Sequence, residues 1–182
     1  MSKGNSEKDS TLAALLRDRP KRGRPPREVS RDNVYVELSE EQKQQVGDLA
    51  DCLPEGFVRA DIADLAIIVL AARLEGLRRA VAGRTREIPE GVTDLDSLYL
   101  LWDLSVPETD NDMRWTSIRV SPQQAIELGR AHGTLNVLFG ATRSEVFGLG
   151  LSLLEHFIEN DLPDEKISSL LEMKEIVTDL YL

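Results

Sequence analysis

The sequence predicts a mainly α-helical fold in which two β-α-α repeats form a two-stranded antiparallel ribbon on a four-helix core, with extra helices outside it. Three observations lead to this fold class. A strand-like segment that runs straight into a helix occurs twice, and a longer apolar helix follows each time. The two copies lie 82 to 84 residues apart in a chain of 182 residues, which indicates an internal duplication.

The later copy has the clearer strand, over residues 115–120. Apolar and polar side chains alternate along it, as in a strand with one buried and one solvated face. The polar set is Trp115, Ser117 and Arg119, and the set expected to face the core is Thr116, Ile118 and Val120. Ser121 is expected to cap the following helix with its side-chain oxygen, and Pro122 suits the first helical position.

The earlier copy repeats this layout over residues 33–38. Asn33, Tyr35 and Glu37 form its polar set, and Val34, Val36 and Leu38 form its apolar set. Ser39 and Gln42 have the spacing of a capping box. A shift of 82 residues places Ser39 on Ser121 and Glu37 on Arg119.

Apolar periodicity predicts a pair of helices after each strand. The expected ranges are 40–52 and 59–81 in the first copy, and 122–133 or slightly beyond and 143–159 in the second. Residues 65–72 are apolar on every side, so that helix is expected in a helix–helix interface. A shift of 84 residues aligns the two longer helices, with Arg143 on Arg59 and Leu149 on Leu65.

The expected division of the chain follows these elements. It comprises an arm over 1–32, a first unit over 33–83, a connector with a short helix over 84–114, a second unit over 115–160 and a C-terminal amphipathic helix within 161–182. The last helix is expected to pack or dimerise through one side, which carries Ile167, Leu170, Leu171, Val177 and Leu180.

A single strand–helix–helix unit leaves its strand without a partner and its longer helix without a covered surface. Both are satisfied when two units intertwine, because the strands then pair and the longer helices cross in a shared core. The pattern does not decide whether the two units belong to one chain or to two chains.

Charge is distributed unevenly along the chain, whose net charge is −10. Residues 1–31 carry nine Lys or Arg and four Asp or Glu, a net charge of +5, whereas residues 32–182 carry 13 and 28, a net charge of −15. A basic arm on an acidic body indicates an arm with its own partner.

Several classes of protein lack their characteristic residues here. Cys52 is the single cysteine, so no internal disulfide forms, and with two histidines it makes no zinc set. The sequence has no apolar run long enough for a membrane span, and neither a phosphate-binding glycine loop nor a nucleophile motif. We therefore expect a protein that is not an enzyme, has no cofactor or metal, and stays off the membrane.

The arm contains a segment that resembles an AT-hook, a motif that lies in the minor groove of A·T-rich DNA. Prolines keep such a segment extended, glycine allows close approach, and arginine side chains enter the narrow groove. The residues in question are Lys21, Arg22, Gly23, Arg24, Pro25 and Arg27. A solvated basic tail remains the alternative.

The duplicated unit resembles the ribbon-helix-helix DNA-binding proteins, the family of the Arc and MetJ repressors. The match is closer at Ser117–Ser121 and Thr142–Val146 than in the first copy, where Glu37 and Phe57 depart from the pattern. With both copies on one chain, it is similar to the tandem members of that family, including the TraY type of relaxosome protein.

The resemblance implies a ribbon that reads the major groove and helix N-termini that hold phosphates. The implied base-reading residues are Asn33, Tyr35, Glu37, Trp115, Ser117 and Arg119, and the implied phosphate contacts are Arg59, Thr142, Arg143 and Ser144. Arg119 suits guanine and Asn33 suits adenine. Glu37 is expected either to accept from cytosine or to form an ion pair with Arg119.

We therefore expect a sequence-specific DNA-binding regulator, most simply a transcriptional repressor, in the bacterial cytoplasm on nucleoid DNA. Its expected partners are double-stranded DNA and a second copy held through residues 161–182. One alternative is an accessory DNA-binding protein of plasmid partition or conjugation. Another is an antitoxin-like interaction module whose acidic body binds a protein.

Overall fold

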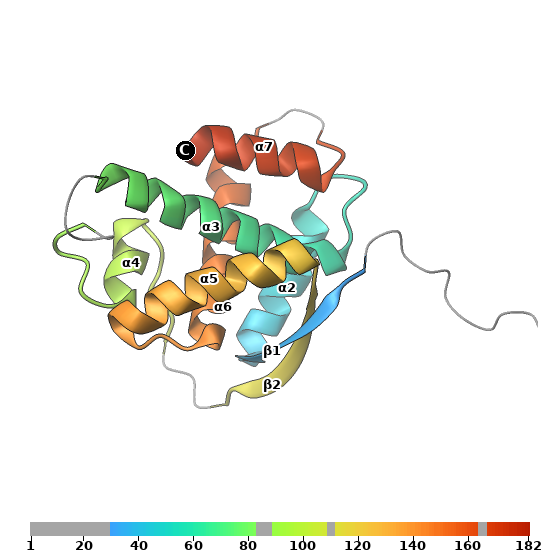
Figure 1. Ribbon diagram of the computed structural model, residues 1–182. Coiled ribbons are helices and arrows are strands. Elements are labelled where there is room, and N and C mark those ends of the chain that lie inside the picture. Colours follow the sequence, from blue (N-terminus) through green and yellow to red (C-terminus); the bar gives the residue numbers. More distant parts are fainter. Residues whose placement is uncertain (1–29, 83–88, 109–111, 164–166) are drawn as a thin grey trace, which may run out of the picture.

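Two strands that are distant in the sequence pair to form the ribbon in the computed structural model, which describes residues 30–82, 89–108, 112–163 and 167–182. They are β1 (Asp32–Leu38) and β2 (Arg114–Val120), and they run antiparallel within one chain. The rest of the described structure is mainly helical. The ribbon lies along one side of the helical body (Figure 1).

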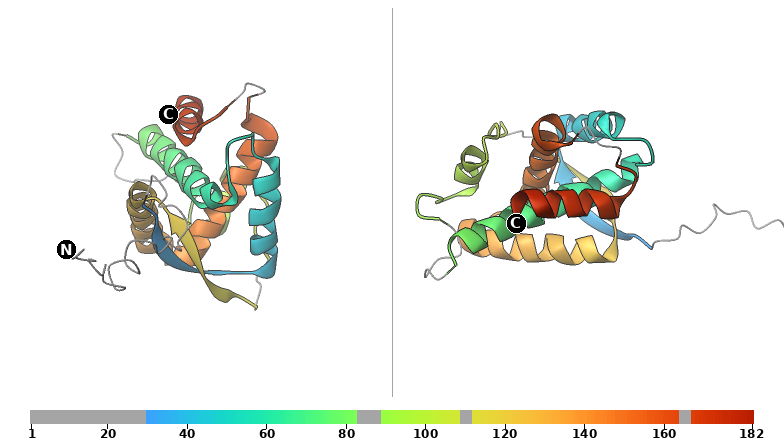
Figure 2. Two further views of the ribbon diagram at one scale, coloured as in Figure 1. Left: turned by 90° about the vertical axis from the view of Figure 1, so that its right-hand side faces the viewer. Right: turned by 90° about the horizontal axis from the view of Figure 1, so that it is seen from above.

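Helices follow the strands in the predicted order. They are α2 (Glu40–Cys52), a 3-10 turn η1 (Arg59–Asp61), α3 (Ile62–Ala80), α4 (Leu95–Leu101), α5 (Pro122–Phe139), α6 (Arg143–His156), a π-helical turn η2 (Phe157–Asp161) and α7 (Leu170–Tyr181). The helix α7 lies on the far side of the body from the ribbon, as the views in Figure 2 also show.

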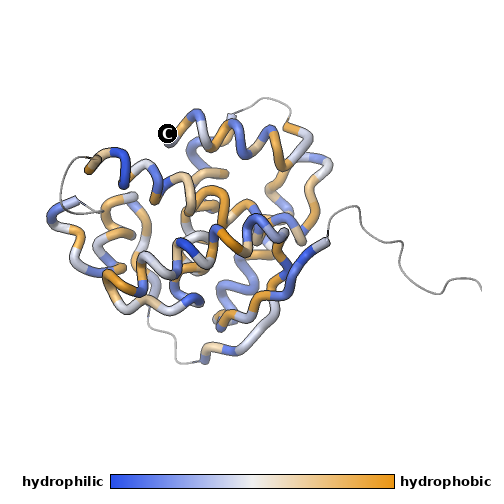
Figure 3. Tube along the Cα trace, viewed as in Figure 1, coloured by the Kyte–Doolittle hydropathy of each residue, from blue (hydrophilic) through white to orange (hydrophobic). Residues whose placement is uncertain are grey.

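The core is built on the contact between α3 and α6, the longer helices of the two copies. Their apolar residues give the mostly orange traces at the centre of Figure 3. Gly150 of α6 lies so close to α3 that an added Cβ would be 3.1 Å from the carbonyl oxygen of Ala66. Gly150 and Ala66 are equivalent under the 84-residue shift, so small residues from both copies permit this close contact.

Local signals in the sequence set several helix starts as expected. Ser39 and Gln42 form the predicted capping box, in which the Ser39 hydroxyl accepts from the Gln42 amide at 3.1 Å. Thr142 and Glu145 form a second one at the start of α6. The predicted range of α2 is confirmed.

The start and the end of α5 differ from the prediction. The side chain of Ser121 makes no capping hydrogen bond, although Pro122 takes the first helical position as expected. The helix continues past Gly133 and ends at Gly140, which has a φ of 71°. A glycine within a helix only weakens it, whereas one in the left-handed conformation ends it.

The C-terminal helix is shorter than predicted and buries different residues. Helix α7 begins at Leu170, and it packs on α3 with Met173 and Val177 buried. Ile167 is buried ahead of the helix, but Leu171 and Leu180 are exposed, so the predicted single apolar side is wrong for those two residues. The face that was expected to serve dimerisation is therefore partly used within the chain.

Polar and aromatic contacts fasten the end of α7. The Tyr181 hydroxyl donates to the Asp161 carboxylate at 2.6 Å, and the Arg73 guanidinium lies 3.8 Å from the centre of the Tyr181 ring. Burial, and then the hydrogen bond to Asp161, raise the pKa of Tyr181. Gly76 leaves room for this arrangement, since a Cβ there would be 2.7 Å from the Tyr181 carbonyl oxygen.

Candidate nucleic-acid interface

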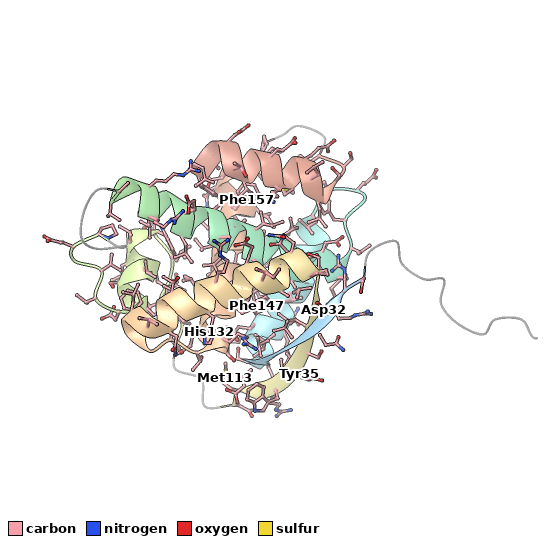
Figure 4. All side chains as sticks on the ribbon, viewed as in Figure 1. Asp32, Tyr35, Met113, His132, Phe147 and Phe157 are labelled. Atoms are coloured by element: carbon pink, nitrogen blue, oxygen red, sulfur yellow. The ribbon has the colours of Figure 1, made fainter. Side chains whose placement is uncertain are left out.

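The side of the ribbon that faces away from the helices carries the six residues expected to read bases. The register pairs Asn33 with Arg119, Tyr35 with Ser117 and Glu37 with Trp115. Tyr35 is 63% exposed and Trp115 is 70% exposed. Figure 4 labels Tyr35 on the ribbon and Phe147 among the helices.

The opposite side of the ribbon faces the core. Val36, Leu38 and Val120 are buried, whereas Thr116 and Ile118 are half-buried. Successive side chains of a strand point to opposite faces, so burial of one set turns the other set outward. The predicted alternation is confirmed in both strands. Among the outward-facing residues, Glu37 is half-buried and the others are exposed.

The expected ion pair between Glu37 and Arg119 is excluded by the register. Glu37 lies opposite Trp115, and Arg119 is four residues farther along β2. At the rise of a strand this separates the two positions by about 13 Å. Each side chain is therefore positioned independently of the other.

A buried serine fixes β1 to α6. The Glu37 backbone N–H donates to the Ser144 hydroxyl at 2.8 Å, and Ser144 is only 7% exposed. Ser144 was expected to contact phosphate. The structure gives its hydroxyl a different role, as an anchor of the ribbon.

Arg31 fixes β2 to the start of α3, on the other copy. Its guanidinium donates to the backbone oxygens of Ala60 and, at 3.4 Å, of Arg119. It also pairs with the carboxylates of Asp61 and, at 3.3 Å, of Asp64. The predicted arm includes Arg31, but this residue is fixed in the fold, and Asp32 already belongs to β1.

Asp64 is buried inside α3 and completes this anchor. Its carboxylate accepts a hydrogen bond at 2.8 Å from the backbone N–H of Ser121, the residue directly before α5. Burial raises the pKa of Asp64, and the Ser121 hydrogen bond and the Arg31 charge only partly offset this effect. An Asp directly before the apolar run 65–72 is the sequence signal that could have predicted this anchor.

The two copies satisfy equivalent backbone groups in different ways. The Ser39 N–H donates to its own capping partner Gln42, and the equivalent Ser121 N–H donates across the core to Asp64. Gly148, the equivalent of Asp64, leaves the space that the Gln42 side chain fills, since a Cβ there would be 2.7 Å from Gln42 Nε2. The duplication is therefore not symmetric at the ribbon.

The first turns of α3 and α6 lie near opposite ends of the ribbon. The start of α3 is held next to Arg119, and the start of α6 next to Glu37. Arg59, Thr142 and Arg143 are exposed there, as a phosphate contact requires. The N-terminus of a helix favours an anion because its first N–H groups have no partner within the helix.

A carboxylate lies at the helix start at each end of the ribbon. At the α6 end, the Glu145 carboxylate accepts from the Thr142 N–H at 2.7 Å and from its hydroxyl at 2.8 Å. Arg114 pairs there with Asp112 at 3.2 Å. At the α3 end the equivalent Asp61 carboxylate accepts from the Val58 N–H at 2.9 Å, and Arg59 and Arg119 are exposed. Each end of the ribbon therefore combines exposed arginines with one carboxylate at the helix start.

The residues of the AT-hook-like segment lie outside the described residues. Within the described ranges no group of three or more His, Cys, Asp or Glu side chains is placed to hold a metal ion. No single described helix has the length and apolar character of a membrane span. Only α5 taken with Arg143–Asp161 does, as a pair bent by 111°.

No family model matches the chain, and neither a curated protein nor a solved structure matches it.

Proposed function

We propose that this chain is a tandem ribbon-helix-helix protein that binds double-stranded DNA in a sequence-specific manner and regulates transcription as a repressor. The observation that carries the proposal is the exposed outer face of a two-stranded ribbon, built from one strand of each copy. The major groove admits a two-stranded ribbon, and base edges there carry a distinct pattern of donors and acceptors.

The outward residues suit base recognition. Arg119 offers two donors to guanine, and Asn33 directly across the ribbon offers a donor and an acceptor to adenine. Tyr35 and Trp115 offer apolar surface to thymine methyl groups. The strands carry different residues at equivalent places, so the subsite in this proposal is not palindromic.

Phosphates on either side of the groove would be held by the starts of α3 and α6, through Arg59, Thr142 and Arg143. The arm would add contacts to an adjacent A·T-rich minor groove through Arg22 and Arg24. In this proposal the protein binds and does not catalyse, and a second copy docks through residues 161–182.

A gel-shift assay on a pool of random duplexes tests the proposal. The intact protein is expected to retain and enrich a subset of sequences. A variant with Asn33→Ala, Ser117→Ala and Arg119→Ala is expected to lose the enrichment, whereas Arg130→Ala, an exposed arginine on α5, is expected to keep it. Enrichment that survives the triple substitution, or no binding by the intact protein, would contradict the proposal.

An accessory role in plasmid partition or conjugation uses the same DNA chemistry and differs only in its partner. An antitoxin-like interaction module is the second candidate function. The exposed apolar residues on the helices favour it, with Val137 of α5 84% exposed and Leu100 of α4 70% exposed. Isolated exposed apolar residues are common, so this observation is weaker than the ribbon.

A further inference from the structure

A cavity of about 490 Å³ lies under β2, between that strand, α2 and the start of α3. Its walls include the half-buried apolar side chains of Val46, Ala63 and Ile118. Cavities of roughly this volume with mainly apolar walls are typical of small-molecule sites. The space lies directly beneath the residues that would contact DNA.

The comparison of the two copies explains why there is space under β2. Ala63 lines it, and the residue equivalent to Ala63 under the 84-residue shift is Phe147, which is fully buried in the second copy. Ala60 is the residue equivalent to Ser144 under the same shift. Because alanine has no hydroxyl, β2 lacks the hydrogen bond that holds β1. Ile118 is half-buried, whereas Val36, its equivalent under the 82-residue shift, is fully buried.

The rim of the cavity is cationic. Lys43, Arg59 and Arg119 line it, and none of the described residues that line it is acidic. Lys43 pairs with the Glu40 carboxylate at 2.8 Å. The Arg59 guanidinium makes a long contact of 3.5 Å to the Lys43 carbonyl oxygen, so an anion at the rim would offer it a much stronger partner.

We propose that this cavity binds a small amphipathic carboxylate. Its apolar chain or ring lies against Val46, Ala63 and Ile118, and its carboxylate lies at Arg59 and Lys43. A free phosphate would use the rim without the walls, and a neutral apolar molecule would use the walls without the rim. Both features together select a molecule that has an apolar part and a negative charge.

Binding there has a consequence for DNA, and this consequence rests on the proposed function. The ligand's carboxylate would take the Arg59 side chain that otherwise contacts a DNA phosphate. It would also occupy the space next to Arg119. The ligand therefore acts as an inducer that releases DNA.

Calorimetric titration of the intact protein with octanoate, and with neutral octanol, tests the site without DNA. One octanoate per chain is expected. Ala63→Phe, which introduces the ring that the other copy carries, is expected to lower octanoate affinity by at least about ten-fold. Ala71→Phe is the matched control, since Ala71 is also a half-buried alanine of α3 but lines a different groove, and it is expected to leave the affinity unchanged.

Charge is tested separately from volume. Arg59→Gln is expected to weaken octanoate by about ten-fold and to leave octanol unchanged. Equal affinity for octanol and octanoate in the intact protein would overturn the ligand class. No octanoate binding, or equal losses in Ala63→Phe and Ala71→Phe, would overturn the site.

DNA binding is measured in a second arm by fluorescence anisotropy. Octanoate is expected to weaken DNA binding by the intact protein and not by Ala63→Phe. If octanoate binds and the protein binds no DNA, the cavity proposal stands and the proposed function fails. If octanoate binds while the affinity for DNA stays unchanged, the inducer role is wrong.

Discussion

Ser144 and Arg31 show how single side chains hold the ribbon on the helices. Each joins a strand to the start of a helix from the other copy, Ser144 through a neutral hydroxyl and Arg31 through a charged network with Asp61 and Asp64. The outer face of the ribbon can bind a partner only if these inner contacts fix its position.

Ser144→Ala is expected to lower the free energy of unfolding by about 1–2 kcal/mol, because the Glu37 N–H then lies part-buried without its acceptor. Ser117→Ala on the exposed face is the control, and it is expected to change stability by less than about 0.5 kcal/mol. Urea denaturation measures both. Equal effects would mean that Ser144 does not anchor β1.

Asp64→Asn tests the buried carboxylate through its dependence on pH. The pKa of Asp64 in the folded state is raised above its ordinary value of 3.8. The folded protein therefore takes up a proton at a higher pH than the unfolded chain does, so acidification between these two pKa values stabilises the native protein. The asparagine variant lacks this gain. The stability of the native protein relative to Asp64→Asn is therefore expected to rise as the pH falls from neutral towards 4.

Urea denaturation at a series of pH values checks this expectation. A relative stability that falls on acidification would mean that the Arg31 charge outweighs burial at Asp64, contrary to the account.

Helices and strands could be predicted from the sequence where neighbouring residues alone determine them. The capping box of Ser39 and the periodicity of α2 fixed that helix to the residue. Helix α5 was expected to end at Gly133 or slightly beyond, and it continues to Gly140, because a glycine ends a helix only where the chain turns left-handed. Arg31 could not be placed, because its partners lie 29 to 88 residues away.

The candidate site was predictable to a similar extent. Period-2 alternation was enough to place Asn33, Tyr35, Trp115, Ser117 and Arg119 on the outer face. Which residues lie opposite each other depends on the register, and so the Glu37–Arg119 pair was wrong. The burial of Ser144 depends on how α6 meets β1, which no local pattern contains.

Gly150→Ala and Gly133→Ala form a matched pair that tests the contact between α3 and α6. Alanine generally stabilises a helix interior by roughly 0.5–1 kcal/mol relative to glycine. A Cβ added at Gly133 would meet no other described element within 4 Å, so this gain is expected there. At Gly150 the new methyl group meets the α3 backbone, and a loss of about 1–3 kcal/mol is expected.

Thermal and urea unfolding measure the pair. If both substitutions raise stability by the same amount, the close approach of the two helices is not as described.

The whole molecule combines a basic arm with an acidic body. Such a body repels DNA at long range, so the proposed function needs the arm for affinity and the ribbon for specificity. The position of α7, on the side away from the ribbon, leaves the ribbon face open (Figure 1). The contribution of the arm to affinity and the contribution of the ribbon to specificity can therefore be measured separately.

Removal of residues 1–29 is expected to weaken binding on all duplexes alike and to reduce the dependence of affinity on salt. Each lost phosphate contact lowers the slope of log affinity against log salt by about 0.9. The deletion must spare Arg31, whose loss would release β2. Titrations at several salt concentrations measure the slope, and an unchanged slope would mean that the arm does not contact DNA.

Arg119→Ala tests most directly whether the outer face of the ribbon reads DNA sequence. Binding sites selected by the intact protein and by the variant are compared, and affinities for the best site are measured at one salt concentration. The variant is expected to lose about 1–3 kcal/mol of binding free energy and its preference at one base pair, with the other positions kept. If the variant selects the same sites with the same affinity, the outer face of the ribbon does not read DNA sequence.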